Sequence, residues 1–185
     1  MSRFRKSDWI ELGWTQLSQN GPDGLKIDIL CDLAGRSKGS FYHHFEDYDA
    51  FLTQLTDTWV KRQTTDLMAD FDPSQPVGPQ MDEMFEAVIA LDYRFELGMR
   101  ELARKFPQLA DRVADVDRMR LEFTTEMYCL RFGVPRDEAE QLATLDYAVL
   151  TGLILLDPDM SADRQKALYE TYDALLVAKY REDAE

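Results

Sequence analysis

The chain has 185 residues, of which 45% are hydrophobic and 11% aromatic, a composition that suits a folded protein with a buried core and excludes a disordered one. Its formal net charge of −14 argues against a general affinity for polyanions. Its two cysteines, Cys31 and Cys129, form no C-x-x-C motif and no disulfide framework, which fits a reducing compartment.

Neither export nor membrane insertion is indicated by the sequence. The first fourteen residues lack the apolar core of a signal peptide, and the longest uninterrupted apolar runs, such as residues 153–156, have only four residues. We therefore expect a cytoplasmic protein with no membrane partner.

The charge is distributed unevenly. Residues 1–45 contain six Lys or Arg and five acids, a net of +1, whereas residues 46–185 contain fifteen Lys or Arg and thirty acids, a net of −15. A polyanion can therefore meet the first segment while the acidic remainder faces away. A net charge near zero over 45 residues is also unremarkable, so charge alone leaves both interpretations open.

Helical periodicity runs through almost the whole chain, and strand signals are scarce. The first predicted helix covers about residues 7–20 and ends at the breakers "NGPDG". A second, at about 26–34, ends at Gly35, and Ser37 is placed to cap a third, short helix at about 38–44. In that third helix Phe41 and Phe45 lie four residues apart, and both should point inward.

A long fourth helix follows at about 47–70, with its buried side marked by Leu52, Leu55 and Trp59, and a proline-rich linker follows at 72–80. Further helices are predicted at about 80–92, 94–105, 108–131, 137–156 and 162–180. We predict an all-α protein of about nine helices. Residues 1–46 form a three-helix N-terminal helix-turn-helix domain, and residues 47–185 form a C-terminal helical domain.

The N-terminal order of helix, short helix, three-residue turn with glycine and short helix is the layout of a helix-turn-helix. Such a reading helix enters the major groove with its N-terminal end toward the bases, and the small residues Gly39 and Ser40 allow its backbone a close approach. Base-edge contacts are predicted from Lys38, Ser40 and His43. Phosphate contacts are predicted from Lys26, Ser37, Tyr42, His44, Tyr48 and the arm residues Arg3 and Arg5.

The segment "GPDGLKIDILCDLAGRSKGSFYHHFEDYDAFL" at 21–52 resembles the helix-turn-helix of TetR-type transcriptional regulators. The residues that match the family pattern are Ile27, Ala34, Gly35, Ser37, Gly39, Phe41, Tyr42, His44 and Phe45. The chain departs from the pattern at Lys26, Arg36 and Tyr48, where the family commonly has threonine, valine and lysine. Lys26 and Arg36 replace some of the positive charge lost there, and Arg36 joins the predicted DNA-binding set. Residues 96–123 resemble a segment in the second domain of one branch of these regulators.

The resemblance implies a homodimer that binds a palindromic operator, a repressor rather than an activator, released by a small-molecule effector. The alternative is a helix-turn-helix protein that acts through protein–protein contacts without an effector pocket. No phosphate loop, nucleophile elbow, zinc-protease pair or EF-hand pattern occurs in the sequence, so we expect no enzymatic activity, and no cofactor or metal is expected.

The C-terminal body offers two further sets of candidates. Thr144, Ala148 and Gly152 form a smooth helical stripe, and the last helix repeats Leu168, Tyr172 and Leu175; the family pairs these two helices with their mates in a four-helix bundle. The alternative is that both faces are internal core of a monomer. Candidates for an effector pocket are Met84, Phe85, Met99, Phe123, Met127 and Tyr128, although ordinary core has the same composition. Glu96 and Arg100 are expected to be a surface pair on one helix.

Overall fold

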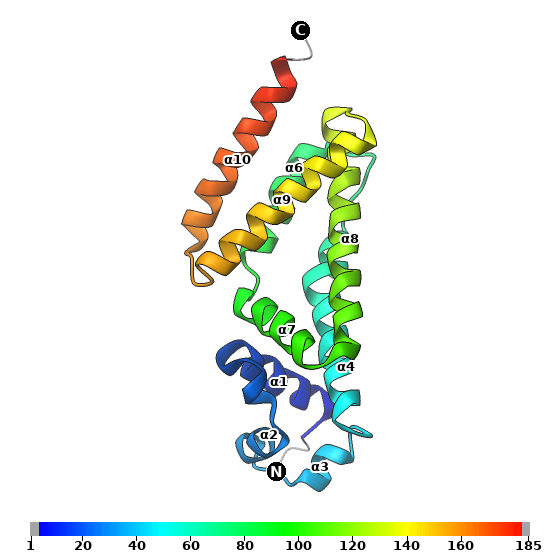
Figure 1. Ribbon diagram of the computed structural model, residues 1–185, viewed down its shortest axis with the longest axis vertical. Coiled ribbons are helices and arrows are strands. Elements are labelled where there is room, and N and C mark those ends of the chain that lie inside the picture. Colours follow the sequence, from blue (N-terminus) through cyan, green and yellow to red (C-terminus); the bar gives the residue numbers. More distant parts are fainter. Residues whose placement is uncertain (1–3, 183–185) are drawn as a thin grey trace. The chain divides into compact units, whose positions relative to one another are not determined.

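The computed structural model describes residues 4–182, and within that range the regular structure is helical, without strands (Figure 1). The predicted all-α class is therefore confirmed. Contacts divide the chain into two units, Met1–Asp66 with Asp92–Arg118, and Leu67–Leu91 with Met119–Glu185. This division by packing differs from the domain boundary predicted after residue 46. The predicted boundary divides the chain by expected function, DNA binding before it and effector binding and dimerisation after it. It stays a prediction.

The first unit contains the N-terminal helices together with α7 and the start of α8. Its elements are α1 (Lys6–Asn20), η1 (Gly21–Leu25), α2 (Ile27–Ala34), α3 (Lys38–Tyr42), α4 (Tyr48–Val60), α7 (Tyr93–Lys105) and the start of α8 (Pro107–Phe132). The helix predicted at 47–70 is α4 followed by a π-helical stretch, η2 (Lys61–Thr65), and a last turn, α5 (Asp66–Met68). Such a π-helical stretch in a long helix is uncommon and often marks a functional site.

Aromatic side chains form the centre of the first unit. Phe41 of α3 is fully buried, and its ring centroid lies 5.3 Å from those of Trp9 and Phe51 and 5.0 Å from that of Phe45. Both inward residues predicted for the third helix are thus in the core. Burial of each such side chain contributes about 1.5–3 kcal/mol, so these contacts hold α3 against α1 and α4.

The contact between α1 and α7 is unusually close. A Cβ atom built on Gly98 of α7 would lie 2.8 Å from Cγ of Leu17 in α1, closer than side chains tolerate. Nearby, the rings of Trp14 and Phe95 stack with centroids 3.6 Å apart. Because glycine has no side chain, the two helices approach until their neighbouring residues pack face to face.

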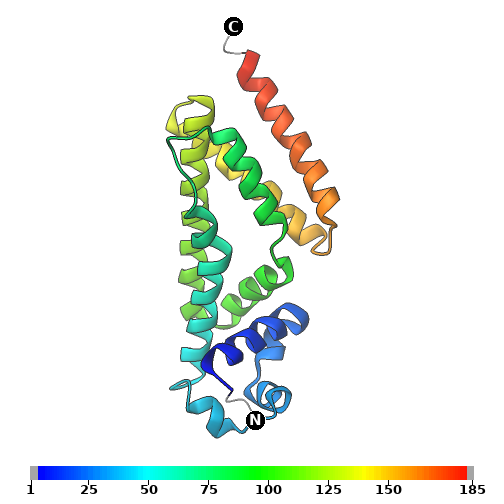
Figure 2. The same cartoon turned by 180° about the vertical axis from the view of Figure 1, so that it is seen from behind.

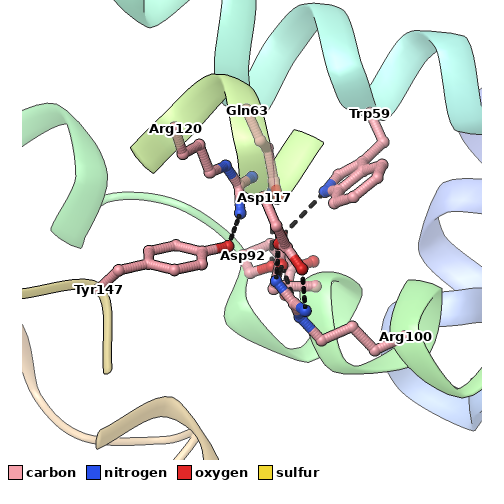
Figure 3. A network of polar contacts seen from close by, with 8 residues as sticks. Trp59, Gln63, Asp92, Arg100, Asp117, Arg120 and Tyr147 are labelled. Atoms are coloured by element: carbon pink, nitrogen blue, oxygen red, sulfur yellow. Dashed lines mark hydrogen bonds and ion pairs between the residues drawn. The ribbon is translucent and has the colours of Figure 1, made fainter. Parts of the chain in front are cut away.

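A buried polar network joins α4, α7 and α8 within the first unit (Figure 3). Trp59 Nε1 donates to Oε2 of Glu96 at 3.0 Å, and Nε of Arg100 donates to Oε1 of Glu96 at 2.9 Å. The two terminal nitrogens of Arg100 bind both carboxylate oxygens of Asp117, at 3.2 and 2.8 Å. The expectation of a surface pair was wrong, since Glu96 is only 5% exposed. The indole donor on α4, which sequence spacing cannot reveal, gives this carboxylate a partner in the interior.

The second unit contains α6 (Val77–Ile89), the rest of α8, α9 (Arg136–Leu156) and α10 (Ala162–Glu182). In both views α6 and α9 lie between α8 and α10 (Figures 1 and 2). The guanidinium of Arg131 on α8 binds both carboxylate oxygens of Asp173 on α10, at 2.5 and 2.9 Å, and the rings of Phe85 and Tyr169 stack at 3.6 Å. The last helix is thereby held by an ion pair to α8 and by ring stacking to α6.

The indole hydrogen bond of Trp59 can be isolated by comparison with Trp9. Both residues are fully buried, but Nε1 of Trp9 has no hydrogen-bond partner among the described residues. Trp59→Phe and Trp9→Phe remove the same volume, and only the first removes a hydrogen bond, the one that Oε2 of Glu96 accepts. We expect Trp59→Phe to lower the free energy of unfolding by about 1–3 kcal/mol more than Trp9→Phe. Denaturant titration measures the difference, and equal losses would show that the Trp59–Glu96 contact stabilises nothing.

Candidate nucleic-acid interface

The turn between α2 and α3 is set by one glycine and one serine. Gly35 ends α2 with φ of 59° and ψ of 39°, a left-handed conformation that costs roughly 1–2 kcal/mol for residues with a Cβ. The next amide, of Arg36, donates to the carbonyl of Cys31 at 2.9 Å. Ser37 is the N-cap of α3, and its Oγ accepts the N–H of Ser40 at 3.3 Å. These local bonds fix the direction in which α3 leaves the turn.

The outward side of α3 carries a compact set of exposed side chains. Phe41 and Phe45 point into the core, while Lys38, Gly39, Tyr42 and His43 are exposed and Ser40 is half-buried. The α-helix itself stops at Tyr42, but the amide of Phe45 still donates to the carbonyl of Phe41 at 3.1 Å. The predicted helix at 38–44 is therefore slightly shorter, with its outward face intact.

Gly39 has no structural reason to be glycine within the protein. A Cβ atom there would meet only Oγ of Ser37, at 3.6 Å, which is an ordinary contact, and its φ is not positive. Glycine in a helix is less favourable than alanine by about 1 kcal/mol. The missing side chain thus favours the approach of another molecule to this point of α3.

The predicted cations of this surface already have acidic partners. Nζ of Lys38 lies 2.6 Å from Oδ1 of Asp28, and Nζ of Lys26 lies 3.3 Å from Oδ1 of Asp23. The hydrogen bond to Asp28 raises the pKa of Lys38. All four side chains are exposed, and exposed pairs are weak because water screens them. A phosphate can therefore replace either carboxylate with little loss.

Other members of the predicted DNA-binding set are engaged within the protein. Tyr48 is half-buried with its ring 6.0 Å from that of Phe106, and burial raises its pKa to about 12. The guanidinium of Arg36 lies 5.7 Å from the centroid of the Phe4 ring, and Nε2 of His44 lies 3.2 Å from the carbonyl oxygen of Phe4. Arg5 and Ser37 are exposed, and Arg3 lies outside the described residues. The outward surface is thus smaller than the sequence predicts.

Acidic residues surround this surface. The exposed carboxylates on or beside the helix-turn-helix are those of Asp23, Asp28, Asp32, Glu46, Asp47 and Asp49. One of them has a local role, because Oδ1 of Asp47 accepts the N–H of Ala50 at 2.7 Å and caps α4. The local charge is close to neutral, so close contact rather than long-range attraction must supply any affinity for DNA.

The second unit exposes apolar side chains on α9 and α10. Of the predicted dimer residues, Thr144, Ala148, Leu168 and Leu175 are exposed, Gly152 is half-buried, and Tyr172 packs inward against the second core. Sequence reasoning missed their exposed apolar neighbours on α9, which are Leu145, Val149, Leu155 and Leu156. By length and composition α9 is apolar enough to cross a membrane. Only 22% of its most apolar 18-residue stretch is buried within the protein, so most of this apolar helix is exposed. A large exposed apolar face of this kind is typical of a surface that binds another molecule.

The predicted effector residues do not line one cavity. Met99 is buried in the core of the first unit, whereas Met84, Phe123, Met127 and Tyr128 belong to or pack against the core of the second, and Phe85 stacks on Tyr169. A groove of about 400 Å³ lies in the first unit between α4 and α8, and none of these residues lines it. Its lining residues are Thr53, Thr56, Asp57, Gln108, Leu109 and Arg112.

The second unit buries the carboxyl group of Asp146, in surroundings that disfavour its charged form. Burial, followed by repulsion from Asp173, raises the pKa of Asp146 on α9 to about 6, and a hydrogen bond from Tyr128 opposes this only in part. Tyr172 faces the same carboxyl group, and its hydroxyl is buried. Sequence reasoning did not single out Asp146, because one acid on a helix with many acids gives no signal.

The fold resembles that of a known regulator. It matches the crystal structure of a transcriptional regulator (TerR/AcrR family) from Aquifex aeolicus with a TM-score of 0.70 and 17% sequence identity, covering 92% of this chain and 98% of that chain. Comparisons with protein-family models and with curated protein sequences found no match. The predicted resemblance to TetR-type regulators is thereby confirmed at the level of the fold.

Asp146 gives the second unit a defined pH dependence. Its pKa of about 6 in the folded protein exceeds the ordinary value of 3.8, so the folded state binds the proton first and stability rises as pH falls from about 7 to about 4. Asp146→Asn removes this dependence and should raise the free energy of unfolding at pH 7 by up to about 3 kcal/mol. Urea titrations at several pH values, with Glu126→Gln as an exposed control on α8, measure it. A constant difference between variant and wild type across this range would contradict the assignment.

Proposed function

We propose that the protein is a dimeric, sequence-specific DNA-binding transcriptional regulator, and that it acts as a repressor. The observation that carries this proposal is the outward face of α3, where exposed polar side chains flank Gly39 while Phe41 and Phe45 hold the helix rigidly from behind. The likeness of fold to a regulator from Aquifex aeolicus supports it.

In this proposal α3 of each protomer enters the major groove of one half of a palindromic operator. Lys38, Ser40 and His43 read base edges, which offer distinct hydrogen-bonding patterns in that groove. Phosphate contacts come from Lys26, Ser37, Tyr42 and the arm residues Arg3 and Arg5. The acidic pairs of Lys26 and Lys38 open when phosphates take the place of Asp23 and Asp28.

Binding of two half-sites requires a two-fold mate. We assign that contact to the exposed apolar face of α9 and α10, on which Leu155, Leu156 and Leu175 are 71%, 83% and 67% exposed. Gly152 fits this role because a Cβ atom there would meet nothing within 4 Å in its own protomer. Helices pack at the distances of a four-helix bundle when small residues line the contact.

An effector of unknown identity would act through α4. We propose that it binds the C-terminal body and favours one direction of α4, which Trp59 ties to Glu96 of α7. Such a ligand can shift the protein only by the difference in its affinity for the two conformations.

One observation favours the alternative of a protein partner. Ile29 and Leu33 of α2 are 37% and 56% exposed and lie beside the acidic residues Asp28 and Asp32. Selection of bound sequences from random duplex DNA distinguishes the two functions, because a protein-binding helix-turn-helix yields no consensus at any salt concentration. Tyr42→Ala, which removes a half-exposed ring, should weaken binding to all selected sequences about equally, since Tyr42 is assigned to phosphate.

Gly39→Ala should separate DNA binding from stability. The added methyl group has room in the free protein, so the free energy of unfolding should stay constant or rise by up to about 1 kcal/mol. Affinity for the selected operator should fall about tenfold or more, because the methyl group occupies the space between α3 and the base pairs. Gly35→Ala is the control, since its positive φ predicts lost stability. Unchanged operator affinity in Gly39→Ala would remove α3 from the groove.

Gly152→Leu tests the dimer. The wild-type protein should sediment as a dimer at micromolar concentration, and the leucine should separate the mates and leave helical monomers, whereas Ala114→Leu at an exposed position of α8 should remain dimeric. Analytical ultracentrifugation and circular dichroism measure both properties. A wild-type monomer, or a protein that binds lipid vesicles through α9, would contradict this assignment.

A further inference from the structure

Phe4, just before α1, contacts α1, the turn of the helix-turn-helix and the residue that follows α3. The ring of Phe4 meets Trp9 of α1 edge to face, with centroids 4.9 Å apart and an interplanar angle of 80°. The guanidinium of Arg36, in the turn, lies 5.7 Å from the centroid of the same ring. Nε2 of His44, just after α3, lies 3.2 Å from the carbonyl oxygen of Phe4. His44 thus holds the backbone carbonyl of a residue 40 positions earlier in the sequence, in the N-terminal arm that precedes α1.

This contact determines which proton His44 carries. A carbonyl oxygen only accepts hydrogen bonds, so Nε2 of His44 must be the donor. Both the neutral tautomer with hydrogen on Nε2 and the imidazolium ion provide that hydrogen. In the neutral ring the other nitrogen, Nδ1, is an acceptor and offers nothing to a phosphate. The hydrogen bond to Phe4 thus uses the donor that a phosphate contact would need.

The hydrogen bond between His44 and Phe4 also affects the position of the next residue, Arg5. The backbone N–H of Arg5 donates to Oδ2 of Asp8 at 2.7 Å, and its side chain is exposed. Arg5 thus lies between two fixed points, the carbonyl held by His44 and the first turn of α1. The backbone from which its side chain extends is therefore placed relative to α3 before any DNA is met, which reduces the entropy lost on binding.

We propose that His44 is a positioning residue, which anchors the N-terminal arm and sets where Arg5 meets DNA, instead of contacting phosphate itself. The inference rests on the proposed function for its effect on DNA, but the anchoring of the arm is a property of the free protein. His43 is a natural control, because it is adjacent and exposed and is assigned to base edges.

The anchoring is tested without DNA. Heteronuclear NOE values for the amides of Phe4 and Arg5, measured in the full-length protein, report the order of the arm. His44→Ala should lower them markedly, whereas His44→Gln, whose Nε2 can still donate, should retain most of the order. His43→Ala, which removes an edge-to-face contact with the ring of His44 but leaves its hydrogen bond, should lower them much less than His44→Ala. Thermal unfolding checks that each variant is folded. Unchanged NOE values in His44→Ala would overturn the proposal, whether or not the protein binds DNA.

The effect on DNA is tested by a double-mutant cycle on the selected operator. His44→Ala should weaken binding about tenfold in the wild-type background and less than twofold when Arg3 and Arg5 are already alanine, because a disordered arm without cations has nothing to place. An equal loss in both backgrounds would make His44 a direct phosphate contact and overturn the proposal. Failure to obtain any operator would refute the proposed function, and the NOE values would still decide the role of His44.

Discussion

Burial of Phe41 between Trp9, Phe45 and Phe51 is the interaction on which the candidate interface depends. A helix of five residues has no stability of its own, because nucleation alone fixes several residues for one hydrogen bond. The aromatic contacts supply what the backbone cannot, and they leave α3 with one side against the core and the other in solvent. The exposed positions of Lys38, Tyr42 and His43 follow from that anchoring.

The second constraint is electrostatic. Because Lys26 and Lys38 pair with Asp23 and Asp28, the candidate interface is close to neutral in the free protein. Exchange of a carboxylate for a phosphate keeps the number of ion pairs constant, so counterion release contributes little and the salt dependence of binding should be shallow. In the proposed complex, affinity must then come from short-range complementarity in the groove, to which the missing side chain of Gly39 and the held backbone of Arg5 would contribute.

The sequence predicted the features that are local and periodic. Helix bounds, the left-handed Gly35, the Ser37 cap and the inward direction of Phe41 all depend on residues within one or two turns of each other. Three features escaped prediction because their partners are remote in the chain: Glu96 is buried by the indole of Trp59, His44 binds the carbonyl of Phe4, and Tyr172 turns inward. Periodicity cannot separate a polar residue facing solvent from one facing a polar partner in the core.

Two glycines connect the fold to the proposed contacts. Several of the others are explained by the protein itself: Gly21, Gly35 and Gly133 have positive φ, and Gly98 lets α7 approach α1. Gly39 and Gly152 lie in helices, have room for a Cβ atom and gain nothing within the protomer. Each lowers helix stability relative to alanine, by up to about 1 kcal/mol in a helix interior. Gly39 lies on the exposed face of α3 and Gly152 lies beside the exposed apolar side chains of α9, so the missing methyl groups fit the proposed close approach of DNA at α3 and of a second protomer at α9.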